Sequence, residues 1–419
     1  MWSRTDLESI QASKDQANVG MHKRSIVHLS RVAREGAMAL ERLYLTGIPP
    51  PPPLGRWVTS PRLPKKDSGP SDDAVAMHGE AWRSAEPLRM ELARLFGCIL
   101  CLGEIGGGIV RELAETTQLD VRNKDTADGF DPQTNADVTT EVVISAVLRT
   151  LFPDVAIIGE EGVEGSEVET PTTDSDHAVR IQRACEEVSA KMETTLAPWE
   201  IQVPDGVTSL RDVTIWIDPL DGTREVLRGD REGVTCLIGA AAMGTPWFGV
   251  INQPWWHPGE GQGMGRTVWG GQGIRGVYAH ATGQVPANAT PVPPPQPSGR
   301  ELLTMVTTRS HGTKELEDSL SLLGDKVERI RVGGAGRKVL MLIDGAVDAY
   351  VFPANGTKRW DTCAGESLLR CLGGSLVKAT DGSSYSYDAE VAADPYNREG
   401  VVATIHHSEG VGPIFRGRL

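Results

Sequence analysis

The segment that most limits the fold of this chain is an apolar run that ends abruptly in two aspartates. Val213–Ile217 consists of apolar and β-branched residues, which predicts a buried strand. The sequence Asp-Pro-Leu-Asp-Gly-Thr follows directly as residues 218–223. A fold that buries this strand must also provide partners for the two carboxylates, because an unpaired charge in a protein interior is strongly unfavourable.

Three more acidic groups stand at the ends of apolar segments. Residues 131–137 precede a predicted helix, Glu160 and Glu161 follow a short predicted strand, and Asp361 opens another helix. Each group has an ordinary structural interpretation. Asp137 and Asp361 could be helix N-caps, worth about 1 kcal/mol each, and the other carboxylates could lie in solvated turns.

Taken together, the acidic groups favour a divalent metal site. Two aspartates separated by a Pro-Leu pair form a stiff platform for a hard cation such as Mg²⁺, which binds several carboxylate oxygens and retains water. One bridging carboxylate can hold two metals about 3.5–4 Å apart, which is the geometry for displacement at phosphorus. Thr223 adds a hydroxyl beside such metals, and Gly222 and Thr223 offer backbone N–H groups to a phosphate.

Alternating patterns over the rest of the chain predict a mixed α and β architecture. Helices are expected over residues 86–102, 138–151, 338–344 and 362–372. Strands are expected over residues 155–159, 213–217, 235–242, 247–251, 302–307 and 346–352. Residues 281–299 are rich in proline and predict a loop.

The first 80 residues have the composition of an extension outside the globular fold. Residues 22–45 could form one helix, and the five prolines at Pro49–Pro53 must adopt an extended polyproline II conformation. Residues 61–71 continue this stretch, for which we expect a plain linker rather than a ligand for an SH3-type domain.

Charge excludes one class of partner. The 42 Lys and Arg against 56 Asp and Glu give a formal charge of −14, so the chain has no surplus of cations with which to coat a nucleic acid polymer. Residues 164–212 carry 11 acidic against 4 basic residues and are expected to form a solvent-exposed insert.

Compartment signals are few. No stretch approaches 18 uninterrupted apolar residues, and the N-terminus has no apolar signal core, so we expect no membrane span and a cytoplasmic protein, with an organelle left open. The six cysteines are sparse, which favours a reducing compartment. We expect Cys98 and Cys101 to be a buried structural pair rather than a metal or redox site.

The spaced motifs resemble a known family. Residues 216–223, preceded by Gly159–Glu161 and followed by Trp360 and Asp361, resemble the signature of the inositol monophosphatase superfamily of Mg²⁺-dependent, lithium-sensitive phosphatases. Motifs at residues 251–254, 307–311, 331–336 and 358–363 are similar to those of its 3′(2′),5′-bisphosphate nucleotidase branch. The likeness covers roughly residues 85–407 and implies a layered αβαβα sandwich.

The resemblance implies a role for each matching position. Two to three Mg²⁺ ions would be held by Glu160, Asp218, the backbone carbonyl of Leu220, Asp221 and Asp361. Asp137 and Thr223 would orient and activate the attacking water. The substrate would contact Gly222, Thr223, Thr308, His311, Gly334 and Lys338, with Lys338 holding the 5′-phosphate.

The reaction implied is direct in-line hydrolysis without a covalent phosphoenzyme. The substrates of the branch are adenosine 3′,5′-bisphosphate, which yields AMP and phosphate, and 3′-phosphoadenosine 5′-phosphosulfate. We expect a monomer that binds a small nucleotide bisphosphate. Its predicted parts are the extension (1–80), an α+β metal-binding domain (81–305) and an α/β nucleotide-contacting domain (306–419).

Two alternatives stay open from the sequence. The nearer one is another branch of the superfamily, an inositol polyphosphate 1-phosphatase or an inositol monophosphatase, and the motifs around Thr308 and Lys338 favour the nucleotide branch over it. The other is a non-catalytic sensor of Mg²⁺ and nucleotide. The chain also departs from the family pattern in its long acidic insert, in Arg337, which could bind phosphate or face solvent, and in Gly365, which could loosen a helix.

Overall fold

Six helices and three sheets form the part of the chain that the computed structural model describes. This part comprises residues 72–116, 119–126, 129–162, 176–257, 264–299, 302–309 and 327–406, with Glu317 and Ser321. Only the backbone is described for residues 72–85, 125, 126, 129 and 130. Nearly all of the predicted extension (residues 1–71) and the predicted contact residue His311 lie outside these ranges.

The elements follow one another in the order that the alternating patterns indicate. The helices are α2 (Asp72–Thr116), α3 (Asn135–Leu151), α4 (Asp176–Thr195), α5 (Thr223–Arg228), α7 (Ala335–Ile343) and α8 (Arg359–Cys371). The first nine strands are β1 (Val121–Thr126), β2 (Gly129–Thr134), β3 (Ala156–Gly159), β4 (Val213–Asp221), β5 (Thr235–Ala242), β6 (Thr245–Gln253), β7 (Arg266–Gly271), β8 (Gly276–Ala281) and β9 (Thr290–Pro291). The others are β10 (Leu303–Thr308), β11 (Val327–Val332), β12 (Ala349–Phe352), β13 (Ser375–Lys378) and β14 (Val401–Thr404).

The two larger sheets are built from successive parts of the chain. A seven-stranded sheet has the order β3-β4-β5-β6-β7-β8-β9, a five-stranded sheet has the order β11-β10-β12-β14-β13, and β1 and β2 form a separate hairpin. Strand β4 pairs parallel with β3 and antiparallel with β5. Residues 79–419 cluster into one compact unit. The predicted domain boundary after residue 305 falls within β10 and stays a prediction.

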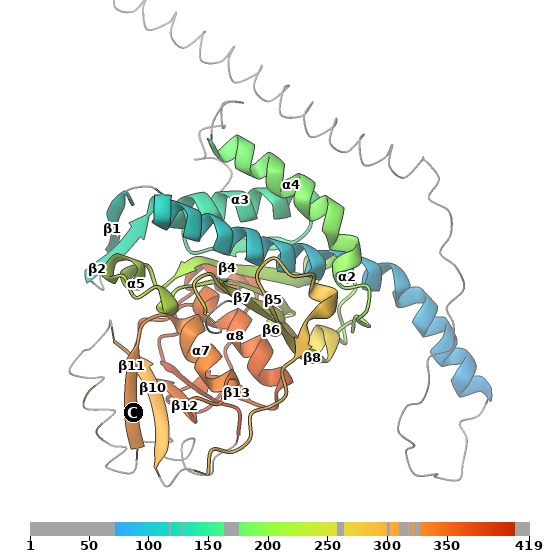
Figure 1. The fold of residues 1–419 in the computed structure, drawn as a ribbon. Helices are drawn as coiled ribbons and strands as arrows, with labels where there is room; N and C mark the ends of the chain where they lie inside the picture. The colour runs from blue at the N-terminus through green and yellow to red at the C-terminus, as the bar shows by residue number, and fades with distance from the viewer. Residues whose placement is uncertain are drawn as a thin grey trace, which may run out of the picture. The chain divides into compact units, whose positions relative to one another are not determined.

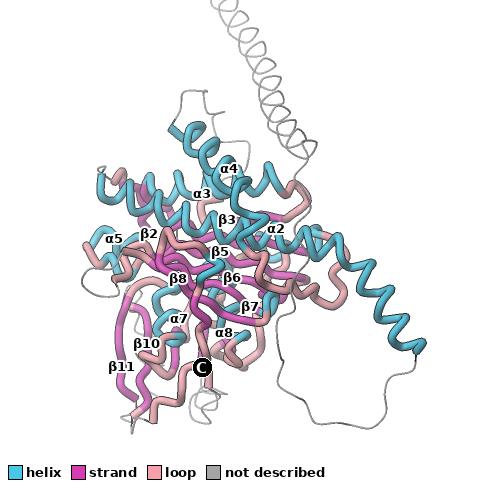
Figure 2. The backbone as a smooth tube through the Cα atoms, turned by 45° about the vertical axis from the view of Figure 1, so that its right-hand side comes forward, coloured by secondary structure: helices cyan, strands magenta, loops and turns pink. Residues whose placement is uncertain are grey.

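Helices and sheets alternate in layers (Figures 1 and 2). Helices α2, α3 and α4 cover one face of the seven-stranded sheet, and α7 and α8 lie between that sheet and the five-stranded one. These are four layers of the predicted αβαβα sandwich, so the layered α/β class is confirmed. The described residues do not assign an outer fifth layer.

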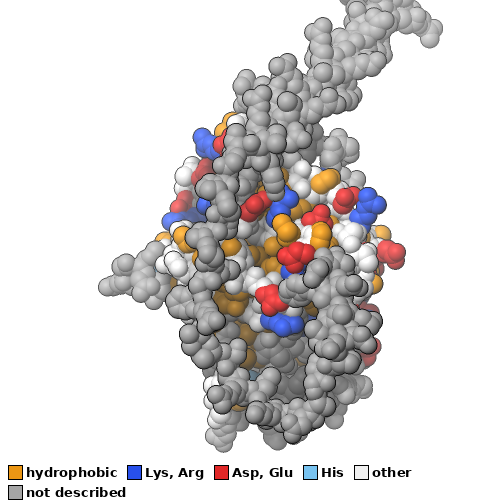
Figure 3. Space-filling model, turned by 90° about the vertical axis from the view of Figure 1, so that its right-hand side faces the viewer, with side chains coloured by type: hydrophobic (Ala, Val, Ile, Leu, Met, Phe, Trp, Pro, Cys, Tyr) orange, Lys and Arg blue, Asp and Glu red, His pale blue; other side chains and the backbone are white. Residues whose placement is uncertain are grey.

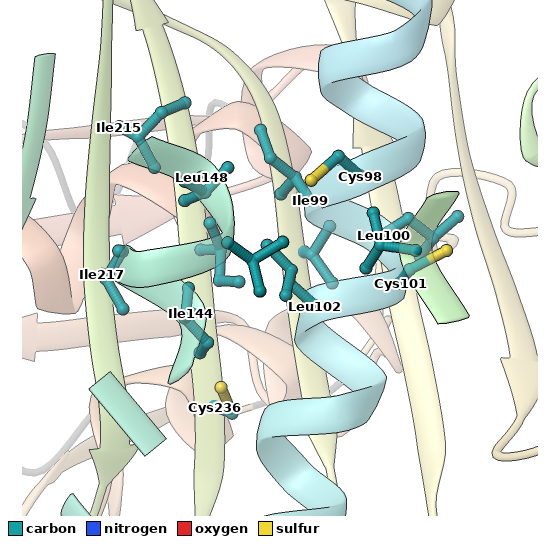
Figure 4. Close-up of a cluster of buried hydrophobic side chains, with 14 of the residues drawn as sticks. Cys98, Ile99, Leu100, Cys101, Leu102, Ile144, Leu148, Ile215, Ile217 and Cys236 are labelled. Atoms are coloured by element: carbon teal, nitrogen blue, oxygen red, sulfur yellow. The ribbon is translucent and has the colours of Figure 1, made fainter. Parts of the chain in front are cut away.

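Strand β4 is buried along its whole length because helices cover both of its faces. Side chains alternate across a strand, so Ile215 and Ile217 point to the face covered by α2 and α3, where they meet Ile144 and Leu148 of α3 (Figure 4). Trp216 points to the opposite face and packs in the core around α8. The apolar run therefore has the composition of a strand with no solvated face.

Glycines let α8 approach the sheet closely. A Cβ on Gly249 of β6 would lie 2.3 Å from the carbonyl oxygen of Ala364, and one on Gly239 of β5 would lie 2.6 Å from the Ala364 nitrogen. Gly365 has the same function toward α7, because its Cβ would lie 2.8 Å from Val339 Cγ2. Helix α8 runs unbroken through Gly365, which serves close packing rather than loosening the helix.

The acidic insert is not wholly solvent-exposed, so that expectation was wrong for its second half. Residues 176–195 form the amphipathic helix α4, and its buried residues Ala184, Val188 and Met192 join the core formed with α2 and α3. The high net charge of the insert concealed the apolar spacing of α4, although the charged residues of this helix lie on one side only. Residues 163–175 of the insert lie outside the described part.

Helix α2 contributes the most apolar helical segment in the described part of the chain. By length and composition Glu86–Thr116 could cross a membrane, but 72% of its most apolar window is buried inside the protein, as in a core helix. Cys98 and Cys101 are buried here without a disulfide, as expected for a structural pair. On the face shown in Figure 3, described acidic and basic side chains are interspersed with apolar ones.

We predict that Gly249→Ala lowers the free energy of unfolding by about 1–3 kcal/mol, because the added Cβ cannot fit against the α8 backbone without moving it. Urea unfolding followed by circular dichroism measures this change. Gly108→Ala is the control, because a Cβ there meets nothing within 4 Å and alanine favours a helix. Equal stability of the two variants would contradict the packing argument.

Candidate active site

A β-bulge at the end of β4 turns its last side chains toward one cavity. Asp218 pairs with Leu237 and Asp221 with Thr235, so three steps along β4 match two steps along β5. The extra residue bends the strand and re-aims the side chains around it. Gly222 then adopts a left-handed conformation (φ 93°), which favours glycine, and α5 begins at Thr223.

Three aspartates converge at this bulge. Ligand oxygens of Asp218, Asp221 and Asp361 lie within 4.8 Å of one another. Burial raises the pKa of Asp218 well above its usual range, and the neighbouring Glu160 and Asp221 raise it further. Burial likewise raises the pKa of Asp361 to about 7. This all-oxygen cluster, which is unfavourable when ionised, fits a hard divalent cation, and its charge would be offset by such an ion.

Asp221 is held rigidly by groups from two other elements. Its Oδ1 accepts a hydrogen bond from the backbone N–H of Ala335 (2.8 Å), and its Oδ2 accepts one from Gly336 (2.7 Å) at the N-terminus of α7. The hydroxyl of Thr235 donates to the same Oδ2 at 2.8 Å. Gly334 makes this approach possible, because a Cβ there would lie 2.3 Å from the Gly233 carbonyl oxygen. The N-terminus of α7 is thereby tied to the end of β4.

Asp137 and Thr223 come together from distant parts of the chain. The Thr223 hydroxyl donates to Asp137 Oδ1 at 2.9 Å and lies 3.2 Å from the carbonyl oxygen of Leu220. The other carboxylate oxygen of Asp137 accepts hydrogen bonds from the backbone N–H (2.8 Å) and the hydroxyl of Thr134. Burial raises the pKa of Asp137 to about 7.

Neither Asp137 nor Asp361 is an N-cap, so that alternative interpretation was wrong in detail. The N-caps are Thr134 and Lys358, and each aspartate is the third residue of its helix, where it bonds back to the cap backbone. The Lys358 N–H donates to Asp361 Oδ2 at 2.6 Å. Each aspartate therefore stabilises the first turn of its helix with one carboxylate oxygen and leaves the other oxygen for contacts outside the helix.

Two lysines, Lys124 and Lys358, lie close to the Glu160 carboxylate. Lys124 of the β1–β2 hairpin donates to Glu160 (2.9 Å) and Glu161 (2.7 Å), and Lys358 Nζ lies 3.9 Å from Glu160. Burial raises the pKa of Glu160, but Lys124 and Lys358 outweigh it and hold that pKa below its usual value. Sequence reasoning missed both lysines. Lys358 lies in a recognised motif, whereas Lys124 has no local signal.

One cavity collects almost all of the predicted site residues. Its lining includes Glu160, Asp218, Leu220, Asp221, Gly222, Thr223, Thr308, Gly334, Lys338 and Asp361. Asp137 is reached through its bond to Thr223. The lining also includes residues that were not predicted as site residues, namely Asp131, Pro132, Arg224, Glu225, Ala335, Tyr350, Phe352, Gly356, Thr357 and Lys358.

Two basic residues of α7 have different surroundings. Lys338 is buried in the cavity wall, where its ammonium donates to the Gly334 carbonyl (2.8 Å) and lies 5.2 Å from the centre of the Tyr350 ring. Burial lowers the pKa of Lys338 to about 8 against the attraction of Asp221 and Asp361. Arg337 neither lines the cavity nor simply faces solvent, because it pairs with Asp230 at 3.3 Å and with Glu232 at 3.5 Å.

Comparison with known proteins assigns this chain to a family. The model of the Inositol monophosphatase family matches residues 99–409. The chain belongs to the inositol monophosphatase family. It is therefore an enzyme of the phosphatase class, and the alternative of a non-catalytic sensor is not supported.

Individual relatives cover most of the chain. Rat 3′(2′),5′-bisphosphate nucleotidase 1 is 34% identical over 323 residues, which is 76% of this chain and 92% of the relative. The putative inositol monophosphatase 3 of Drosophila pseudoobscura pseudoobscura is 31% identical over 339 residues, 80% of this chain and 83% of the relative. The mouse Golgi-resident adenosine 3′,5′-bisphosphate 3′-phosphatase is 28% identical over 323 residues, 74% of this chain and 78% of the relative.

The aspartate cluster predicts that metal stabilises the fold. We expect Mg²⁺ to raise the thermal unfolding midpoint by a few degrees, since saturation at 100 times Kd adds about 2.7 kcal/mol. Asp218→Asn should remove most of this shift, because it removes a central oxygen ligand of the cluster. Asp212→Asn is the control, since Asp212, like Asp218, accepts a hydrogen bond from a backbone N–H but lies outside the cavity lining. Equal Mg²⁺ shifts in both variants would contradict the assignment.

Proposed function

We propose that this phosphatase removes the 3′-phosphate of adenosine 3′,5′-bisphosphate, and also that of 3′-phosphoadenosine 5′-phosphosulfate, in a Mg²⁺-dependent, lithium-sensitive reaction. One observation carries the proposal. The aspartate cluster and the residues matching the nucleotide-branch motifs, Thr308, Gly334 and Lys338, line the same cavity. A substrate with two anionic groups could therefore meet both sets of residues at once.

The proposed metal ligands are the oxygens that surround the bulge. They are the carboxylates of Glu160, Asp218, Asp221 and Asp361 and the backbone carbonyl of Leu220, for two to three Mg²⁺ ions. When bound, Mg²⁺ would lower the pKa of a coordinated water and offset negative charge on the leaving oxygen. The converging carboxylates support this assignment, because burial and the neighbouring Glu160, Asp221 and Asp361 raise the pKa of Asp218, and a cation would offset this cost.

Thr223 and Asp137 have the geometry of a proton relay. The Thr223 hydroxyl uses its hydrogen toward Asp137 and keeps lone-pair capacity for a proton from the attacking water. Asp137 can hold a proton passed on by Thr223, because burial raises the pKa of Asp137 to about 7. Thr134 fixes the carboxylate from its other side, so that one oxygen of Asp137 stays aimed at Thr223.

The nucleotide would lie along the part of the cavity that Thr308, Gly334 and Lys338 line. Thr308 at the end of β10 and Gly334 before α7 are proposed substrate contacts, with His311 as a further contact outside the described residues. Lys338 would hold the 5′-phosphate. A neighbouring phosphate favours the charged ammonium and would offset the effect of burial on the Lys338 pKa.

An inositol phosphate is the second candidate substrate. The putative inositol monophosphatase 3 of Drosophila pseudoobscura pseudoobscura favours it by its name. The printed names of the rat and mouse relatives support the nucleotide instead. We also propose two domains, at residues 81–305 and 306–419, a monomeric state and a cytoplasmic location. The Golgi-resident mouse relative makes an organelle the alternative location.

We expect faster phosphate release from adenosine 3′,5′-bisphosphate than from inositol 1,4-bisphosphate, because only the nucleotide would use the wall formed by Thr308 and Gly334. The assay measures inorganic phosphate with Mg²⁺, with a chelator, and with Mg²⁺ plus millimolar lithium. Chelation and lithium should both suppress turnover if metals complete the site. Faster turnover of the inositol compound would overturn the substrate assignment.

We expect Asp137→Asn to lower kcat by about 10²–10⁴-fold, the usual contribution of a positioned acid or base, while KM changes little. An amide cannot hold the proton that Thr223 passes on. Asp212→Asn serves again as the control and should keep wild-type kcat. Circular dichroism and the thermal midpoint check that both variants are folded. Near wild-type turnover by Asp137→Asn would remove this residue from the relay.

A further inference from the structure

A buried carboxylate that the proposed reaction does not use is part of the cavity lining. Glu225 follows Thr223 in α5, and only 1% of its surface is exposed. Its Oε2 accepts a hydrogen bond from the guanidinium of Arg309, and its Oε1 accepts one from Arg228 at 3.2 Å. Burying a carboxylate costs desolvation energy, which the two arginines offset only while both stay in place.

Glu225 also contacts the turn that leads into α7. A Cβ on Gly333 would lie 2.1 Å from the Glu225 carboxylate, and one on Gly233 would lie 3.2 Å from Glu225 Cβ. No other residue type fits at Gly333 unless Glu225 moves. The glutamate therefore fills the space between α5 and the Gly333–Gly334 turn.

Arg309 extends these contacts to the second sheet. It follows Thr308 at the end of β10, and its backbone N–H donates to the Val332 carbonyl of β11 at 3.1 Å. Its side chain bonds Asp230 at 2.6 Å as well as Glu225. Asp230 in turn pairs with Arg337 of α7. The network thus joins α5, the end of β10 and α7, each of which contributes residues to the cavity lining.

The members of the network balance in charge and share partners. Its acids are Glu225, Asp230 and Glu232, and its bases are Arg228, Arg309 and Arg337. Because Glu225 is buried, loss of Arg309 would leave a desolvated charge short of a partner, which costs far more than breaking an exposed pair. The buried Glu225 carboxylate therefore holds Arg309, and with it the end of β10, against α5.

We propose that Glu225 and Arg309 are positioning residues that fix the distance between Thr223 at the phosphate end of the cavity and Thr308 at its nucleoside end. The inference rests on the roles given to Thr223 and Thr308 in the proposed function. The pair sets specificity for an elongated substrate that reaches both residues. A small phosphate ester uses the Thr223 end alone and does not depend on this distance.

The test compares a long and a short substrate in Arg309→Met, Glu225→Gln and the double variant. For adenosine 3′,5′-bisphosphate, each single variant should raise KM by about tenfold or more, the effect of breaking a charge pair whose carboxylate is buried. We expect kcat to stay within about twofold. For p-nitrophenyl phosphate, kcat/KM should stay within about twofold of wild type. The double variant should cost less than the two single effects combined, because the two residues act on each other.

The matched control is Arg266→Met. Arg266 makes a similar two-bonded pair with Asp344, at 3.0 and 2.6 Å, but neither residue lines the cavity. This variant should leave KM unchanged for both substrates. An equal loss with the long and the short substrate, or no loss at all, would overturn the positioning role.

Failure of the proposed substrate can be told apart from failure of this inference. If wild type turns over inositol 1,4-bisphosphate faster than the nucleotide, the substrate assignment falls. The same KM comparison, made with the inositol compound against p-nitrophenyl phosphate, then decides the positioning role. A selective rise in KM for the longer substrate supports it, and a uniform effect overturns it.

Discussion

The burial of several carboxylates at the end of β4 is the constraint on which the rest of the structure depends. Ligand oxygens of Asp218, Asp221 and Asp361 lie close together, burial raises the pKa of both Asp218 and Asp221, and no apolar core could tolerate these carboxylates unaided. Three features of the surroundings offset this cost. Backbone N–H groups of α7 donate hydrogen bonds to Asp221, and ammonium groups lie near the cluster. The oxygen-lined space also suits a divalent metal ion. The bulge in β4 and the neighbouring glycines allow these carboxylates to lie close together.

Strongly patterned segments could be predicted from the sequence, and weakly patterned ones could not. The buried strand β5 matches its predicted range, because a continuous apolar run between turn residues allows few alternatives. The β1–β2 hairpin was not predicted, since its polar residues have no period that marks a strand. Helix α4 was hidden by its charge, although every third or fourth residue is apolar. A sequence pattern predicts a helix or strand only where one side of it is buried and therefore carries apolar residues at regular spacing.

The same distinction holds within the site. Motif residues such as Asp218 and Lys338 could be named from the sequence, because their spacing along the chain is short and their chemistry is specific. Lys124 could not, because its role arises only from contact with Glu160, 36 positions away. Arg337 was equally ambiguous until Asp230 proved to be its partner, 107 positions away. A residue whose function depends on a distant partner carries no local signal.

By itself the sequence determined the buried strand and the family to which the chain belongs, and it predicted the carboxylates that we propose as metal ligands. Only the tertiary structure decided that Thr223 bonds Asp137 across 86 positions, that Asp221 accepts a hydrogen bond from the first residue of α7 across 114 positions, and that Glu225 lies against Arg309. The physical reason is the distance along the chain over which each effect acts. Local preferences act over a few residues, whereas burial, pKa shifts and ion-pair networks depend on which distant segments the packed layers bring together.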